Sequence, residues 1–168
     1  MNRQIQAMMG SVEGRYLNTA EQSMLREQAQ GLEARLAAMT EIAAKESVIV
    51  DRTIKEVMRA YPDFEKKYKT AQQSGVRDQT LVLRYATLAM VRNDPQYLAD
   101  TLLTWMATIL RGVGLAPQFI QDAYKILERV ATKELSPATG KLLQPFLAQC
   151  INSLSPSPPT PLPSSGAM

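Results

Sequence analysis

Residues 81–91 read LVLRYATLAMV and carry a single charged side chain, that of Arg84. An apolar run of this kind predicts a helix that is buried on nearly all sides, at the centre of the protein. The run gives way to Asp94 and Pro95, a pair that predicts the capping residue and the first turn of a following helix. A central helix of this type needs other helices to cover it.

Helical patterns also occupy the segments on both sides of this centre. They cover residues 3–12, 19–45 and 50–58 before it, and after it they open at Pro95, Pro117 and Ser136-Pro137. Asn18 with Glu21, or Thr19 with Gln22, predicts the cap of the helix over 19–45. Pro145 is expected to kink the last helix or to reset its start. With no alternating strand pattern, we predict an all-α body of about seven helices.

The composition excludes several classes of function. The 168 residues contain no histidine and one cysteine, which excludes His-dependent nucleophile systems, intrachain disulfides and His- or Cys-based metal centres. We therefore predict neither an enzyme nor a metal site. A net charge of +3 does not indicate a nucleic-acid partner. The sequence lacks a secretory signal and any apolar run of roughly 20 residues, so we expect a cytoplasmic protein without membrane insertion.

The C-terminal segment differs from the rest of the chain. Residues 154–168 hold five of the ten prolines and no charged residue, so we predict one folded domain over residues 1–153 and a disordered Pro/Ser-rich tail over 154–168. A docking peptide in the polyproline II conformation is the alternative interpretation of the tail.

The predicted helix over residues 19–45 is longer than a compact body of this size needs, at about 40 Å. Its apolar stripe either projects and packs against another chain or belongs to a long core helix of a bundle. The stripe consists of Met24, Leu25, Leu32, Leu36, Met39 and Ala43.

Polar residues stand at the entry to the central helix. Arg77 and Arg84 are seven residues apart and share one helix face, and Asp78 follows Arg77 directly. Two guanidinium groups and a carboxylate at such a place can hold the polar edge of a ligand or a partner's carboxylate. Ordinary surface charges are the alternative interpretation.

Three segments resemble the phycobiliprotein family, and within it most closely the β-type subunits of allophycocyanin. They are residues 12–19 (VEGRYLNT), residues 83–90 (LRYATLAM) with the following Asp94-Pro95, and residues 140–155. The resemblance covers about residues 11–155 and implies a globin-like fold with two extra N-terminal helices. In the family these helices pack α against β subunits.

The resemblance also implies where a pigment would sit. The family attaches an open-chain tetrapyrrole, a bilin, through a thioether to a cysteine, and that position is Gly75 here. The family's arginine pair, which holds the pigment's propionates, aligns with Thr70 and Ala71. We therefore expect no covalent bilin. Arg77 and Asp78 match the residues that follow the attaching cysteine, and they would hold a bilin bound noncovalently.

The positions that the family uses for assembly are better preserved. Arg84 matches the arginine that bonds a carboxylate on the partner's N-terminal helices, and Tyr16 matches the tyrosine that meets the partner's equivalent arginine. Ser11 stands where the family has an aspartate, so we expect a heteromer with a phycobiliprotein-type subunit rather than a homodimer. The remaining predicted interface residues are Leu25, Leu32 and Leu36.

These observations lead to three hypotheses about function. The first is a chromophore-free structural or regulatory subunit of a phycobilisome or related photosynthetic antenna, located at the cytoplasmic (stromal) face of the thylakoid membrane. The second is a carrier or light-harvesting subunit that binds a bilin noncovalently. The third, an enzyme of bilin handling, lacks both a histidine and an acid–base pair.

Overall fold

The computed structural model describes residues 3–64 and 70–155, and all regular structure in these ranges is helical. The elements are α1 (Arg3–Ser11), α2 (Thr19–Ala29), α3 (Leu32–Ala60), α5 (Ala71–Arg92), α6 (Pro95–Leu98), the π-helical segment η1 (Ala99–Leu103), α7 (Thr104–Gly112), α8 (Pro117–Glu134) and α9 (Pro137–Leu154). The prediction of an all-α protein is confirmed. In the described ranges no helix is long and apolar enough to cross a membrane.

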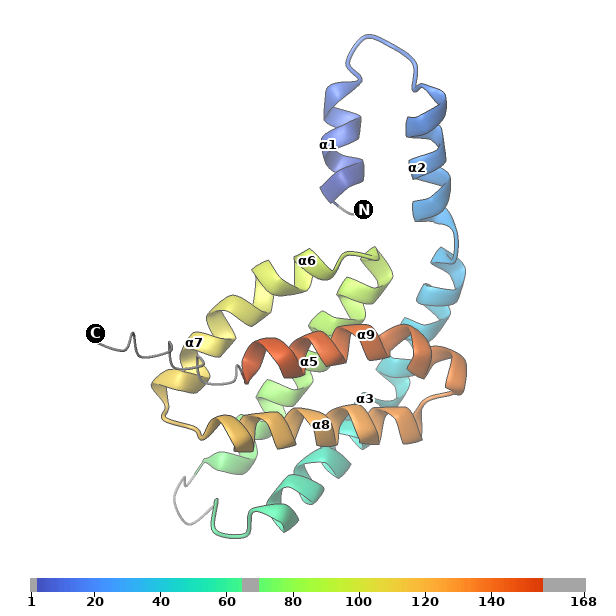
Figure 1. Cartoon of the computed structure of the whole chain (residues 1–168). Coiled ribbons are helices and arrows are strands. Elements are labelled where there is room, and N and C mark those ends of the chain that lie inside the picture. Colours follow the sequence, from blue (N-terminus) through green and yellow to red (C-terminus); the bar gives the residue numbers. More distant parts are fainter. Residues whose placement is uncertain (1–2, 65–69, 156–168) are drawn as a thin grey trace, which may run out of the picture.

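Four long helices form the body, with α5 at its centre. Helix α3 packs against α5 and α8, and α9 packs against the same two helices from its own side (Figure 1). The predicted central helix is confirmed, because Val82, Leu83, Ala86 and Ala89 of α5 have no exposed surface. The helix extends ten residues further towards the N-terminus than the apolar run that revealed it.

The predicted caps set where the helices begin. Asn18 and Glu21 form a capping box at α2, which decides between the two predicted caps. The Asp94 carboxylate accepts a hydrogen bond from the backbone N–H of Tyr97 at 3.0 Å and starts α6. Helices α6, α8 and α9 each begin with a proline, as predicted. Pro145 lies inside a continuous α9, so it does not reset the start of that helix.

The predicted single helix over residues 19–45 is wrong, because the chain turns at Gly31. This glycine adopts the left-handed conformation with φ of 74°, which other residues reach only with strain. Beyond the turn, α3 runs unbroken to Ala60 and joins two segments that the sequence pattern had separated. The buried side chains of Ile42, Ile49 and Val50 keep one helix face continuous across the predicted gap.

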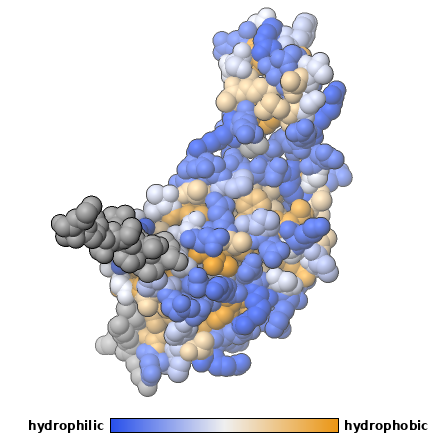
Figure 2. All heavy atoms as spheres, viewed as in Figure 1, coloured by the Kyte–Doolittle hydropathy of each residue, from blue (hydrophilic) through white to orange (hydrophobic). Residues whose placement is uncertain are grey.

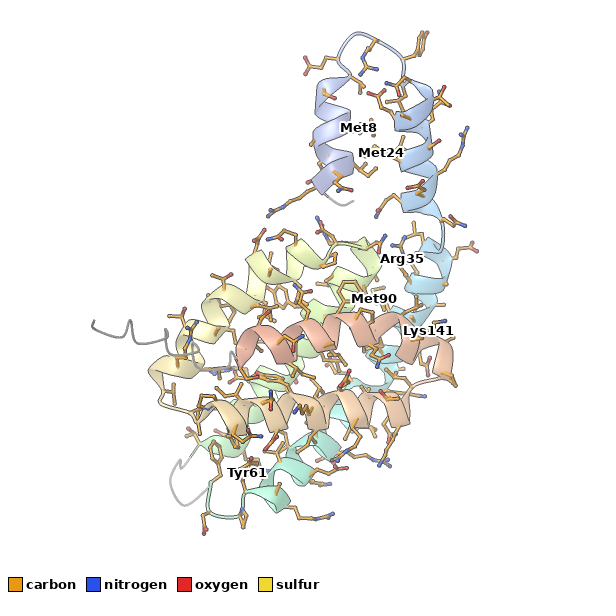
Figure 3. All side chains as sticks on the ribbon, in the orientation of Figure 1. Met8, Met24, Arg35, Tyr61, Met90 and Lys141 are labelled. Carbon is orange, nitrogen blue, oxygen red and sulfur yellow. The ribbon has the colours of Figure 1, made fainter. Side chains whose placement is uncertain are left out.

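A buried arginine holds this turn in place. The Arg35 guanidinium is 6 % exposed, and its Nη2 donates to the carbonyl oxygens of Gln28 at 2.7 Å and Gln30 at 3.4 Å. Carbonyls at the end of a helix have no partner within the helix. Arg35, on the first turns of α3, therefore satisfies the end of α2 and fixes the angle between the two helices (Figure 3).

Helices α1 and α2 form an arm that projects from one end of the body (Figure 1). Met8 of α1 and Met24 of α2 lie between the two helices (Figure 3). The arm is held to the body by an ion pair between Arg3 and Asp100 and by the Gln28 side chain, which donates to the Arg92 carbonyl at 2.7 Å. Helix α2 thus projects with the arm, whereas α3 enters the core through Ala38 and Ile42. The predicted stripe does not form that buried face, because Leu32, Leu36 and Ala43 are exposed.

The C-terminal helix extends slightly further than the predicted body. Leu154 is the last residue of α9 and is fully buried, and Ser155 is buried beside it. The folded body therefore reaches two residues past the predicted end at 153. The rest of the predicted tail, residues 156–168, lies outside the described residues.

Glu41 connects α3 to the start of α9. Its carboxylate accepts hydrogen bonds from the Ser136 backbone N–H at 2.8 Å, the Ser136 hydroxyl at 2.7 Å, the Thr139 hydroxyl at 2.6 Å and the Lys45 ammonium at 2.9 Å. The Thr139 hydroxyl, followed by Lys45 and Ser136, lowers the pKa of Glu41 from 4.5 to about 2. The negative charge thus serves as a second cap for α9.

We expect Glu41→Gln to lower the free energy of unfolding at pH 7 by about 1–2 kcal/mol, because bonds to a charged acceptor are lost at a partly solvated site. The folded pKa lies below the unfolded one, so the contribution is complete above pH 4.5 and disappears as the pH falls towards 2. Urea unfolding at pH 7, 4 and 3 should show the difference between wild type and variant shrinking. The exposed Glu33→Gln on the same helix is the control, and a pH-independent difference would contradict the role of the charge.

Candidate functional site

A cavity of about 180 Å³ lies beside the first half of α5. Its wall is mostly apolar and comes from α3, α7 and α8, and it includes Ile54, Val57, Leu110, Phe119, Ile120 and Ala123. The polar lining comes mainly from α5. Gly75, Arg77 and Asp78, which the sequence singled out, all line this cavity.

Gly75 is a position where α5 lies close to α3 at this cavity. A Cβ atom built on Gly75 would lie 3.0 Å from Cδ1 of Ile54, a distance that requires the isoleucine to move. Ile54 is itself 4 % exposed and belongs to the core. Glycine therefore relieves a close helix contact here and presents no side chain to the cavity.

Arg77 and Asp78 form a pair at the mouth of the cavity. Arg77 Nε donates to Asp78 Oδ1 at 3.0 Å, and the arginine side chain is 67 % exposed while the aspartate is 22 % exposed. The aspartate acts on the buried Tyr124: burial first, and then the negative charge of Asp78, raise the pKa of that phenol above its ordinary range. Arg84 lies two turns further on and does not line this cavity.

Gln79 lines the same cavity and was not identified from the sequence. Its side chain is 5 % exposed, and its Oε1 has no hydrogen-bond partner among the described residues. A buried acceptor without a donor costs free energy, so such atoms often mark a place that another molecule can satisfy. The available signal was a polar residue one turn after Gly75, on the face of α5 that leads into its apolar run.

Cys150, the only cysteine of the chain, does not line the cavity. It lies on α9 with 1 % of its surface exposed, and burial raises the pKa of its thiol to about 12. The thiol is therefore protonated at neutral pH and packs as an apolar group, as the sequence predicted. Among residues 3–64 and 70–155 no cluster of three or more acidic or cysteine side chains is placed to hold a metal ion.

Apart from Arg84 on α5, the predicted interface residues lie on the arm and on the neighbouring first turns of α3. Tyr16 stands at the tip of the arm and is 98 % exposed, and Leu32 and Leu36 are each 41 % exposed. Leu25 is half-buried on α2. Figure 2 shows apolar surface on the arm, bordered by hydrophilic residues. Leu32 and Leu36 are four residues apart on α3 and so share one helix face, and neighbouring exposed apolar side chains of this kind are typical of a protein-binding surface.

Arg84 already has a carboxylate within its own chain. Its Nε and Nη2 donate to the two carboxylate oxygens of Glu46 on α3, both at 2.7 Å. The Glu46 carboxylate raises the pKa of Arg84. Arg84 would therefore keep a carboxylate partner in a homodimer as well. The absence of an acid at Ser11 is then no reason to expect a heteromer rather than a homodimer. The contact between Arg84 and a partner stays a prediction.

The effect of Gly75→Ala on the free energy of unfolding is expected to depend on the side chain at position 54, because the two positions are in close contact. Inside a helix alanine is favoured over glycine by about 0.5–1 kcal/mol, but here the new methyl group meets Ile54 Cδ1. The substitution should raise the free energy of unfolding less in the wild-type background than in Ile54→Val, which lacks Cδ1. Urea unfolding of the four chains measures this coupling. Gly112→Ala, which meets no atom within 4 Å, is the control; equal gains for Gly75→Ala in both backgrounds would argue against the contact.

Comparison with known proteins agrees with the family resemblance. The family model for phycobilisome proteins matches residues 10–154. The chain is similar to the allophycocyanin beta chain of Mastigocladus laminosus, with 28% identity over 86% of this chain and 92% of the relative. It is similar to the allophycocyanin subunit beta of a Nostoc species, with 27% identity over 86% of this chain and 91% of the relative. The all-α, globin-like chain thus belongs to the phycobilisome protein family.

Proposed function

We propose that the chain is a chromophore-free phycobiliprotein-like subunit that acts as a structural or regulatory component of a phycobilisome or a related photosynthetic antenna assembly. In this role it works by binding another phycobiliprotein-type subunit rather than by catalysis, and nucleic acid is not a partner. Its place is the cytoplasm, at the cytoplasmic face of the thylakoid membrane, reached through the antenna and without insertion.

The observation that carries this proposal is Gly75. A thioether requires sulfur, and the residue aligned with the family's attaching cysteine has none. The packing around this position supports the same conclusion, since even a single carbon there would press on Ile54. Cys150 offers no substitute, because its thiol is buried on another helix with a pKa of about 12.

The assembly part of the proposal is supported by the arm. Its tip presents Tyr16 almost entirely to solvent, and Leu32 and Leu36 leave apolar surface exposed where the arm joins the body. Burying such side chains against a partner contributes about 25 cal/mol for each Å² removed from water. The heteromer is preferred on family membership, as the chain is similar to β-type chains, which pair with α-type chains in the resemblance set out above.

A noncovalent bilin is the alternative, and Asp78 is the observation that favours it. Its carboxylate lines the cavity and could accept hydrogen bonds from the pyrrole nitrogens of a pigment, while Arg77 stands beside it. In this case the chain would be a carrier or a light-harvesting subunit with the same fold.

Expression in pigment-producing cells tests the absence of a chromophore. We expect the intact mass to equal that of the apoprotein and the purified chain to show no visible absorption band, because Gly75 cannot form the thioether. A mass increased by one bilin would contradict the proposal. A visible band without a mass change would support the noncovalent alternative, and Asp78→Ala should then abolish it while Asp63→Ala, outside the cavity, leaves it.

Native mass spectrometry and light scattering, alone and with an allophycocyanin α-type subunit, test the assembly. We expect a complex whose dissociation constant increases at least about tenfold in Leu32→Asp and Leu36→Asp, because each change places an unpaired charge in an apolar contact. Trp105→Asp, equally exposed at 41 % but on α7 at the other side of the body, is the matched control (Figure 1). If the chain does not bind the α-type subunit, or if the two leucine variants bind it as tightly as the wild type, the proposed interface is wrong.

A further inference from the structure

We infer that the cavity beside Gly75 binds a small single-ring aromatic molecule that carries one O–H or N–H donor, and that Gln79 is the residue that recognises the donor. The inference does not depend on the subunit role. If the chain assembles with a partner but binds no such molecule, this inference is wrong and the proposed subunit role still stands.

The size of the cavity sets the size of the ligand. Its volume of about 180 Å³ is close to that of an engineered apolar cavity of about 150 Å³ that binds benzene. An open-chain tetrapyrrole has four rings, each similar in size to benzene, so the cavity has room for about one of them. A pigment would leave most of its length outside, whereas a single-ring molecule would fit within the cavity.

The wall of the cavity favours an aromatic ring. Ile54, Val57, Leu110, Ile120 and Ala123 provide apolar contact from three helices. The Phe119 ring also lines the cavity and stacks on Phe64 with centroids 4.1 Å apart and planes at 17°. Binding of an aromatic ring against this wall is favourable because it removes apolar surface from water. The apolar side chains of the wall cannot hydrogen-bond a polar ligand.

The polar atoms of the cavity explain why the ligand needs one donor. The Tyr124 hydroxyl donates to the sulfur of Met106 at 3.7 Å, and Asp78 Oδ1 accepts from Arg77. Gln79 Oε1 differs from both, because it is buried and lacks a donor within the described ranges. The Asp78 carboxylate can also accept a hydrogen bond, but it is partly solvated and paired with Arg77. An O–H or N–H group on the ring would fill this position, and a purely hydrocarbon ring would leave the oxygen unsatisfied.

Calorimetric titration of the full chain with phenol and with benzene separates the contribution of the donor from that of the ring. We expect both to bind the wild type, and Gln79→Leu to weaken phenol about fivefold, the amount expected from the loss of one neutral hydrogen bond. Benzene should bind this variant within about twofold of the wild type. Gln73→Leu, an exposed glutamine on the same helix, should change neither affinity.

Ala123→Leu provides a second variant that tests the cavity itself, because the larger side chain occupies part of the volume. It should weaken both ligands by at least about tenfold, with circular dichroism confirming that the helices remain. The inference is overturned if phenol does not bind the wild type, if Gln79→Leu binds phenol unchanged, or if the filled cavity still binds both. It is also overturned if biliverdin, an open-chain tetrapyrrole, binds more tightly than phenol and displaces it.

Discussion

The burial of α5 is the constraint on which the rest of the structure depends. A helix whose residues 82, 83, 86 and 89 have no exposed surface cannot be stable in water alone, since most of the stability of a helix in a protein comes from packing its apolar surface. Helices α3, α8 and α9 supply that packing, and the short α6 and η1 lead the chain back across it. The cavity lies beside the first half of α5, where residues of α3, α7 and α8 face it.

Much of the fold could be predicted because local signals and burial agree. The apolar run revealed α5, and Asp94, Pro117 and Ser136 marked helix starts through chemistry that needs only a few neighbouring residues. The turn at Gly31 was missed for a physical reason. A stripe at helical spacing continues across it. Gly31 permits the turn, but the Arg35 contacts that hold it form only in the folded chain.

The same distinction applies to the site. Arg77 and Asp78 were identified from their place at the entry to the central helix and Gly75 through the resemblance, and the structure brings all three to one cavity. Gln79 and the pairing of Arg84 with Glu46 were not found. Both depend on which residues of α3, α7 and α8 lie opposite α5, and a periodic pattern within one segment does not contain that information. Sequence separation between Glu46 and Arg84 is 38 residues, far beyond the reach of local rules.

The unbroken length of α3 has a mechanical consequence. The helix begins at the Gly31 turn, where Arg35 holds the end of the arm, and it reaches the cavity wall at Ile54. These two points are separated by about 30 Å of continuous helix, which is stiff because no glycine or proline interrupts it. One continuous helix therefore joins the base of the arm, where we propose that a partner binds, to the wall of the cavity, and no hinge lies between the two.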